Sequence, residues 1–143
     1  MKYRYMLGIF AVLSILIVVL TSCGNSNAVP LGSQELQVRL SEYKITSSVT
    51  TFSPGTTYHF VVTNTGHLAH EFMIMPKGTN MRGMSMDEMH RIALHMIDNV
   101  APGETMTFDY TFPSSMMGQN LELACNLPGH YEAGMRLSIM ISR

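Results

Sequence analysis

Hydrophobic and polar residues alternate along several short segments of the chain, and each segment predicts a β-strand with one buried face. The alternation is clearest in Met106–Phe112, where Thr and Asp separate apolar side chains at every second position. Turns rich in Pro and Gly divide the segments. Short strands separated in this way indicate an all-β sandwich. The predicted strands cover residues 36–40, 58–62, 70–74, 106–112, 121–125 and 137–141.

The segment 85–99 departs from this pattern. It contains no Pro or Gly, and Ser85 and Glu88 have the spacing of a capping box. We therefore predict a short helical insert at about residues 85–99, three or four turns long, between two strands. The apolar residues at helical spacing are Met89, Ile92, Ala93 and Met96.

The first residues predict a secretory signal. Lys2 and Arg4 precede the charge-free run Tyr5–Leu20, which is shorter than the ~20 residues of a membrane-spanning helix. The run ends in Leu-Thr-Ser-Cys23, which resembles a bacterial lipobox, and that motif implies cleavage before the cysteine and a lipid on its sulfur. We expect residues 1–22 to be a lipoprotein-type signal peptide, with ordinary cleavage nearby as the alternative.

The rest of the chain predicts one folded domain. Residues 23–33 are small and polar, which is typical of a flexible tether, so the domain is expected to cover residues 34–143. From Cys23 onward, seven Lys and Arg stand against ten Asp and Glu, a net charge of about −3. No basic run and no Trp is present, and we expect no binding to nucleic acid.

Four residues have the chemistry of a copper site. Cys125, His130 and Met135 follow one another on a single loop, and His70 lies upstream in a predicted strand. Two imidazoles, one thiolate and a weakly bound thioether are the ligands of a type 1 (blue) copper site. With Cys23 bound to lipid, Cys125 has no disulfide partner, and metal ligation explains a lone thiol in an extracytoplasmic protein. Structural zinc is the alternative, but it usually takes more than one Cys.

The loop and the upstream histidine resemble those of the cupredoxins, the small blue copper proteins that include azurin, plastocyanin, auracyanin and rusticyanin. The resemblance covers about residues 34–143, and its most specific part is the loop, with Pro128 and Gly129 before the histidine. It implies a cupredoxin-like Greek-key β-sandwich. The metal ligands that it implies are His70, Cys125 and His130, with Met135 as a long axial ligand.

The residue after the first histidine differs from the common family pattern. Many cupredoxins have Asn there, whereas this chain has Glu71. Its carboxylate could accept hydrogen bonds from the cysteine loop, or lower the reduction potential by its charge. The sequence also resembles periplasmic cupredoxins linked with copper tolerance, which share the His-Glu-Phe strand and a polar helical insert.

Methionine is abundant around the predicted helix. Thioethers favour Cu(I), so a second Cu(I) site could form near Met81, Met84 and Met86. The alternative is that Met89 and Met96 pack the helix against the sandwich, because Met is an ordinary filler of apolar cores.

The resemblance implies a monomeric electron carrier that shuttles single electrons through one type 1 copper. It would be a lipoprotein anchored to a bacterial membrane outside the cytoplasm. Redox partners are expected to dock near His130, with Leu127, Pro128 and either Met116 or Met117 as an apolar rim. The alternative is a copper tolerance or delivery protein that uses the same site and the Met-rich segment. We do not expect an enzyme, because protein ligands would fill every copper position.

Overall fold

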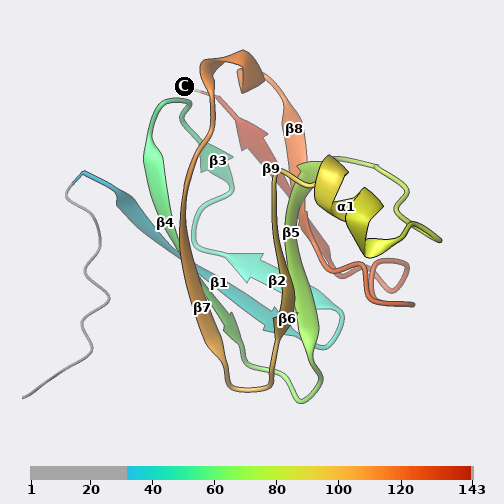
Figure 1. Ribbon diagram of the computed structural model, residues 1–143. Coiled ribbons are helices and arrows are strands. Elements are labelled where there is room, and N and C mark those ends of the chain that lie inside the picture. Colours follow the sequence, from blue (N-terminus) through green and yellow to red (C-terminus); the bar gives the residue numbers. More distant parts are fainter. Residues whose placement is uncertain (1–31, 143) are drawn as a thin grey trace, which may run out of the picture.

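The computed structural model describes residues 32–142, which form two β-sheets packed face to face (Figure 1). The predicted signal peptide and the lipid on Cys23 lie outside these residues. One sheet has the strand order β2-β1-β4-β7 and the other β3-β9-β8-β5-β6. This is the predicted Greek-key sandwich. Its strands are β1 (Gln34–Ser41), β2 (Lys44–Ser47), β3 (Thr51–Phe52), β4 (Thr57–Asn64), β5 (His70–Pro76), β6 (His95–Val100), β7 (Thr105–Thr111), β8 (Asn120–Ala124) and β9 (Arg136–Ile141).

The core lies between the sheets because alternate side chains of each strand point inward. Leu36, Val38 and Leu40 of β1 are almost completely buried, and Phe60 and Phe72 face each other from opposite sheets with ring centroids 6.3 Å apart. The pairs β1–β4 and β3–β9 are parallel, and the other pairs are antiparallel. All six strands that the alternation predicts are present. The sequence analysis missed β2, β3, β6 and the 3-10 helix η1 (Ser114–Met116).

The predicted helix at 85–99 is too long. Helix α1 (Met86–Ile92) begins with the predicted capping box between Ser85 and Glu88, but Ala93 is already extended. The backbone N–H of Leu94 then donates to the Ile74 carbonyl at 2.7 Å. Pairing with β5 therefore ends the helix and turns the following residues into strand β6.

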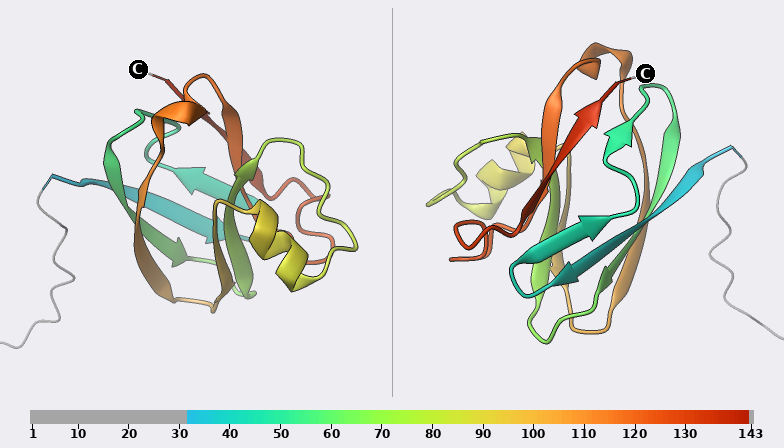
Figure 2. Two further views of the ribbon diagram at one scale, coloured as in Figure 1. Left: turned by 45° about the horizontal axis from the view of Figure 1, so that its top comes forward. Right: turned by 180° about the vertical axis from the view of Figure 1, so that it is seen from behind.

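Helix α1 packs on the outer face of the five-stranded sheet, so both faces of β5 are buried. Phe72 and Ile74 face the main core, whereas Met73 and Met75 face outward and pack with Met89 of α1. In Figures 1 and 2, α1 lies on the same side of the sandwich as the loop between β8 and β9. Within residues 32–142, no helix has the length and apolar character needed to cross a membrane.

Candidate metal centre

Strands β5 and β8 bring His70 and Cys125 to the same end of the five-stranded sheet. The two strands are antiparallel neighbours, with Met73 opposite Ala124, so the beginning of one lies beside the end of the other. His70 is the first residue of β5, and Cys125 follows the last residue of β8. A register shift between His70 and Phe72 in the β5–β6 pair marks a bulge at this point; bulges of this kind often re-aim side chains next to functional sites.

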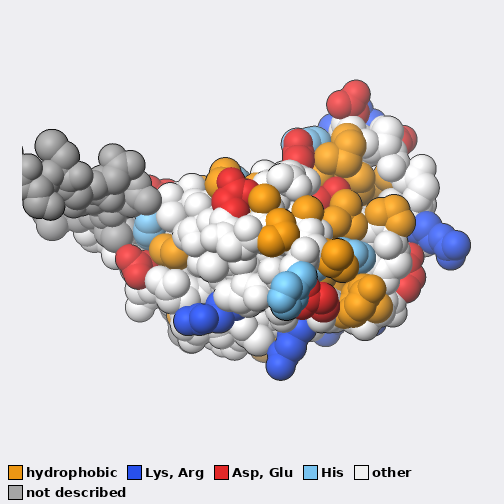
Figure 3. All heavy atoms as spheres, turned by 90° about the horizontal axis from the view of Figure 1, so that it is seen from below, with side chains coloured by type: hydrophobic (Ala, Val, Ile, Leu, Met, Phe, Trp, Pro, Cys, Tyr) orange, Lys and Arg blue, Asp and Glu red, His pale blue; other side chains and the backbone are white. Residues whose placement is uncertain are grey.

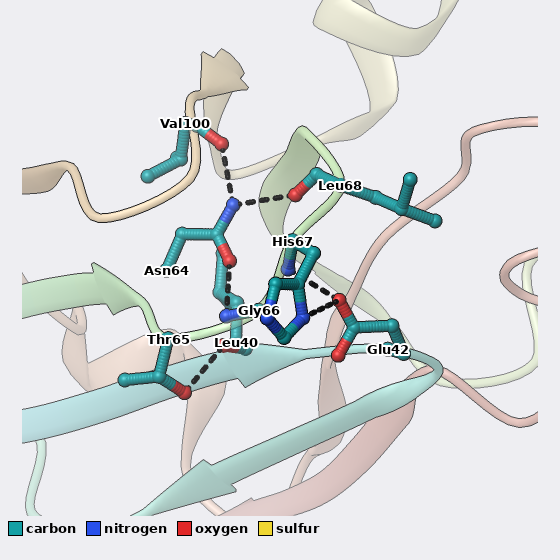
Figure 4. A network of polar contacts seen from close by, with 8 residues as sticks. All are labelled: Leu40, Glu42, Asn64, Thr65, Gly66, His67, Leu68 and Val100. Atoms are coloured by element: carbon teal, nitrogen blue, oxygen red, sulfur yellow. Dashed lines mark hydrogen bonds and ion pairs between the residues drawn. The ribbon is translucent and has the colours of Figure 1, made fainter.

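The turn before His70 is held by a network of polar contacts around the buried side chain of Asn64 (Figure 4). The side-chain amide of Asn64 donates to the carbonyls of Leu68 and Val100 at 2.7 and 2.9 Å, and its oxygen accepts from the Gly66 N–H at 2.9 Å. Glu42 accepts from the backbone N–H of His67. These contacts join the turn to both sheets and thereby fix the point at which β5 begins.

The cysteine loop (residues 125–135) closes on itself through backbone hydrogen bonds. The Cys125 N–H donates to the Met135 carbonyl at 3.1 Å, and the Met135 N–H donates to the His130 carbonyl at 3.0 Å. Gly129 and Gly134 both have positive φ, 85° and 100°, a conformation that favours glycine. The tight loop therefore returns His130 and Met135 to the neighbourhood of Cys125.

Tyr131 ties the cysteine loop to the sheet. Its hydroxyl donates to the buried carboxylate of Glu122 on β8 at 2.6 Å. The guanidinium of Arg136, at the start of β9, lies 4.7 Å from the centre of the Tyr131 ring and donates to the Tyr131 carbonyl at 3.2 Å. His130 is thus next to a residue with three attachments to the strands on either side of the loop.

Three donor atoms converge at this end of the sandwich. The Nδ1 atoms of His70 and His130 are 3.3 Å apart, and the Sγ of Cys125 is 3.4 Å from the His130 Nδ1. Donor atoms of the three residues lie within 4.8 Å of one another. Met135 is fully buried and belongs to the same core cluster as Cys125. The structure therefore brings the three predicted strong ligands together, and metal ligation by all four residues stays a prediction.

Burial acts in opposite ways on the two buried donor groups, favouring the metal-binding form of His70 but not that of Cys125. It is the main cause that lowers the pKa of the His70 imidazole, with repulsion from His130 second, so the neutral ring is favoured. The buried Nε2 of His70 has no hydrogen-bond partner. Burial also raises the pKa of the Cys125 thiol, while the backbone N–H groups of Leu127 and Glu71 act in the opposite direction. Those N–H groups would stabilise the thiolate that a metal requires.

Glu71 accepts a hydrogen bond from the cysteine loop, as one of the two sequence-based alternatives supposed. The donor is the backbone N–H of Asn126. Glu71 is only 4% exposed, and its Oε2 has no partner. Burial is the main cause that raises the pKa of this carboxyl group. Because side chains alternate along β5, Glu71 points away from the face of the sheet that carries His70.

The surroundings of His130 differ from the predicted rim. Met116 and Met117 lie in or next to η1, at the opposite end of β8 from the cysteine loop (Figure 1), so they cannot border His130. Tyr43 lies there instead, in an edge-to-face contact with ring centroids 5.3 Å apart. Tyr43 has a φ of 57° in the β1–β2 turn, and no Gly, Asn or Pro marks that turn in the sequence, so no sequence signal pointed to this residue.

Seen from below, the molecule has an uneven distribution of hydrophobic side chains (Figure 3). They gather on the side where α1 and the cysteine loop lie, with charged side chains between them. Tyr43 and Leu68 are about half exposed, at 49% and 47%. This end of the sandwich therefore offers apolar contact area to other molecules.

Comparison with solved structures identifies the class of fold. The structure matches reduced auracyanin from Roseiflexus castenholzii with a TM-score of 0.59 and 17% identity, over 78% of this chain and 99% of that one. It matches an azurin from Methylomonas sp. strain J with a TM-score of 0.56 and 15% identity, over 78% and 99%. The protein therefore has the cupredoxin fold, which confirms the resemblance inferred from the sequence.

Sequence comparison finds two curated relatives, both named copper-resistant cuproprotein CopI. The protein from Vibrio cholerae is 38% identical over an alignment of 95 positions, and the match covers 62% of this chain and 53% of the relative. The protein from Pseudomonas aeruginosa is 29% identical over an alignment of 135 positions, and that match covers 72% of this chain and 73% of the relative. The chain thus spans about half the length of the Vibrio protein. No family model matches the chain.

Proposed function

We propose that the protein binds one copper ion at a type 1 site and exchanges single electrons through it. The ligands would be His70, Cys125 and His130, with Met135 in the axial position. The observation that carries this proposal is the convergence of two Nδ1 atoms and one Sγ atom at a single point. Two imidazoles and one thiolate with a weak axial thioether are the donor set of blue copper proteins.

The protein residues have defined tasks in this proposal. The Asn64 network and the backbone bonds of the cysteine loop hold the ligands in place, so they need little movement when the charge of the site changes. The N–H groups of Glu71 and Leu127 stabilise the thiolate. Burial of His70 and Cys125 keeps water away. Copper held there would supply a one-electron couple, because this ligand set accepts both of its oxidation states.

His130 is the proposed route for the electron. Its side chain is partly exposed, while those of His70 and Cys125 are buried. Tyr43 covers one edge of the ring, and Pro128 of the same loop is exposed. We propose that redox proteins dock weakly on this surface, as is usual for small electron-transfer interfaces. A monomer that performs no catalysis fits this role.

The cellular location is part of the proposal. The predicted signal peptide and lipobox support a lipoprotein that is attached to a bacterial membrane through Cys23 and faces the periplasm or the cell exterior. Such an anchor would keep the carrier close to membrane redox partners. Mass spectrometry of the purified protein checks this point: a mature chain that begins at a lipid-modified Cys23 is expected, and an unmodified Met1 or an unmodified cysteine would contradict it.

The second candidate function is copper tolerance or copper delivery through the same site. The names of the two curated relatives favour it. Deletion of the gene distinguishes the candidates. A tolerance protein is expected to leave the deletion strain sensitive to added copper, whereas a strain that grows normally in copper but loses a respiratory electron flux would favour the carrier.

The first experiment is the visible spectrum after addition of one Cu(II) to the chain from Gly24 onward, which keeps every described residue. We expect an intense thiolate-to-copper band and one copper per chain. The band should vanish in Cys125→Ser and in His70→Gln. The matched control is His67→Gln, an exposed histidine close to His70, which should keep the band. Copper bound without the band would contradict the proposed site.

A further inference from the structure

Three methionine sulfur atoms converge on the opposite face of β5 from His70. Met73 and Met75 are fully buried on β5, and Met81, which precedes α1, is 4% exposed. The side-chain nitrogen of Asn126 donates toward all three Sδ atoms, at 3.2 Å for Met73, 3.5 Å for Met75 and 3.6 Å for Met81. One point in the protein is therefore surrounded by three buried thioethers.

Hydrogen bonding to Asn126 is a poor explanation for this convergence. A primary amide has two N–H donors, and thioether sulfur is a weak acceptor, so three sulfur atoms cannot all be well paired. The amide nitrogen is nevertheless the positively polarised end of the group. This nitrogen lies at the point where the lone pairs of the three sulfur atoms would favour a cation.

A buried carboxylate beside the thioethers is an independent sign of a cation. Glu71 lines the same cavity of about 730 Å³ as Met81 and Asn126. Its Oε2 has no hydrogen-bond partner although the side chain is 4% exposed. The Asn126 N–H donates to the carboxyl group, but a buried carboxylate oxygen that is left without a partner is costly unless a cation compensates it. Three soft donors and one carboxylate oxygen without a partner therefore lie close together around Asn126.

We propose that Met73, Met75 and Met81 bind Cu(I) where their sulfur atoms converge, beside this cavity, with the Glu71 carboxylate balancing its charge. Thioethers select Cu(I) over hard divalent ions, which prefer oxygen ligands. A single carboxylate matches a monovalent cation. The long side chains of methionine can adjust to bring their sulfur atoms closer to the metal.

This ligand set differs from the one inferred from the sequence. Of the predicted trio, only Met81 approaches the convergence point. Met84 is half-buried in the cavity wall and Met86 is 39% exposed. The two additional ligands come from β5, where the alternation of the strand places Met73 and Met75 on the outer face. The inference uses none of the four predicted ligands of the cysteine site, so it stands or fails separately from the proposed function.

The first test maps the ligands directly. The full chain is purified in detergent as the thiol-free variant Cys23→Ser/Cys125→Ser, labelled with ¹³C at the methionine methyl groups. Ag(I), a redox-inert and equally soft ion, is then added up to one equivalent. We expect the signals of Met73, Met75 and Met81 to shift together and to saturate at one equivalent. Shifts confined to Met84 and Met86, or gradual shifts of all exposed methionines, would overturn the proposal.

The second test measures Cu(I) affinity by competition with the chelator bathocuproine disulfonate, in the same thiol-free chain. Loss of an outer partner of a metal site typically costs about 10–100-fold in affinity, so loss of the ligands should cost more. We expect Met73→Leu/Met75→Leu/Met81→Leu to weaken binding by more than about 100-fold and Glu71→Gln by about 10-fold. The matched control replaces three exposed methionines, Met106, Met117 and Met140, by Leu.

The chelator competition distinguishes a Cu(I) site from ordinary packing of methionine side chains. Unchanged Cu(I) affinity in the buried triple variant, or an equal loss in the exposed triple variant, would show that the cluster only fills space. Leucine has nearly the volume of methionine, so the fold should tolerate these changes. If the buried triple variant does not fold, the Ag(I) titration still decides, because it leaves every methionine in place.

Discussion

Asn64 shows how a residue without a ligand role can determine the geometry of the cysteine site. Its side chain is completely buried and connects the turn before β5 with the last residue of β6. Its partner Val100 lies on β6, a strand that the sequence pattern did not predict, so nothing in the sequence pointed to this role. In the structure, its hydrogen bonds hold in place the turn that directly precedes His70.

Asn64→Ala should destabilise the fold and weaken copper binding together. The substitution leaves the carbonyls of Leu68 and Val100 without their donor, and an unsatisfied buried polar group costs about 1–3 kcal/mol. We expect a loss of about 2–4 kcal/mol in the free energy of unfolding, measured by urea denaturation of the copper-free protein. Thr63→Ala is the control, since its exposed bond to Thr105 should contribute under about 1 kcal/mol. Equal losses in both variants would contradict the bracing role.

Tyr43 should control access to His130. Its ring covers one edge of the imidazole, so Tyr43→Ala exposes that edge without changing a ligand. We expect the copper content and the visible band to stay unchanged. In stopped-flow measurements, a small outer-sphere reagent should reduce the copper of the variant several-fold faster than that of the parent protein. Met140→Ala, an exposed apolar residue on β9, is the control and should react like the parent protein. A slower variant would mean that the tyrosine itself conducts the electron.

At the scale of elements, the sequence predicted the strands in which apolar residues recur at every second position, whatever their burial in the structure. The alternation in β1 and β9 corresponds to one buried face, whereas β5 and β8 are buried on both faces and β7 has no fully buried residue. Strand β6 lies at an edge, and its six residues contain no Pro or Gly that would separate them from the helix before them. Backbone pairing with β5 decides the outcome there, and such a long-range contact leaves no local signal.

The contact between β6 and β7 predicts a dependence of stability on pH. His95, the first residue of β6, stacks on Phe108 of β7 with ring centroids 3.7 Å apart. Burial lowers the pKa of this imidazole from its ordinary value of 6.5. When the pH falls below 6.5, the unfolded chain therefore binds a proton at His95 more readily than the folded chain does. Folding stability from this residue is therefore present above pH 6.5 and decreases as the pH falls toward the lowered pKa.

His95→Phe should keep the stacking and reduce this dependence on pH. The measurement is urea denaturation of the copper-free protein at pH 5 and pH 7. We expect a smaller difference between the two pH values in the variant than in the parent. Tyr110→Phe is the control, because Tyr110 lies on the same strand as Phe108 and burial raises its pKa from the ordinary value of 10.0, so its charge does not change between pH 5 and pH 7. Identical pH dependence in parent and His95→Phe would show that protonation of His95 does not affect folding.

At the scale of the whole molecule, the cysteine site could be predicted because three of its four residues are on one loop with characteristic spacing. The cluster of Met73, Met75 and Met81 could not be assigned in the same way. Its sulfur atoms come from a strand and from a separate segment, and only the packing of α1 on the sheet brings them together. The abundance of Met indicated soft-metal chemistry, but the tertiary structure was needed to choose the three residues.

The two proposed sites are linked through the backbone at two places. His70 and Glu71 are consecutive in the chain, and so are Cys125 and Asn126. In each pair, the first residue belongs to the cysteine site and the second lines the cavity beside the methionine sulfur atoms. The Asn126 N–H also donates to the Glu71 carboxylate. A cation in the cavity would therefore add positive charge next to the strands that carry the copper ligands.

This arrangement predicts coupling between the sites. One equivalent of Ag(I), bound in the cavity, should raise the reduction potential of copper at the cysteine site, because added positive charge favours the less positive oxidation state. A tenfold coupling corresponds to about 59 mV for one electron, and by linkage the reduced and oxidised proteins should then differ tenfold in Ag(I) affinity. Protein-film voltammetry measures the first quantity and titration of the two redox forms measures the second. The variant Met73→Leu/Met75→Leu/Met81→Leu should show neither effect. A shift of the same size in that variant would place the bound Ag(I) elsewhere, and an unchanged potential with Ag(I) bound in the cavity would mean that the two sites act independently.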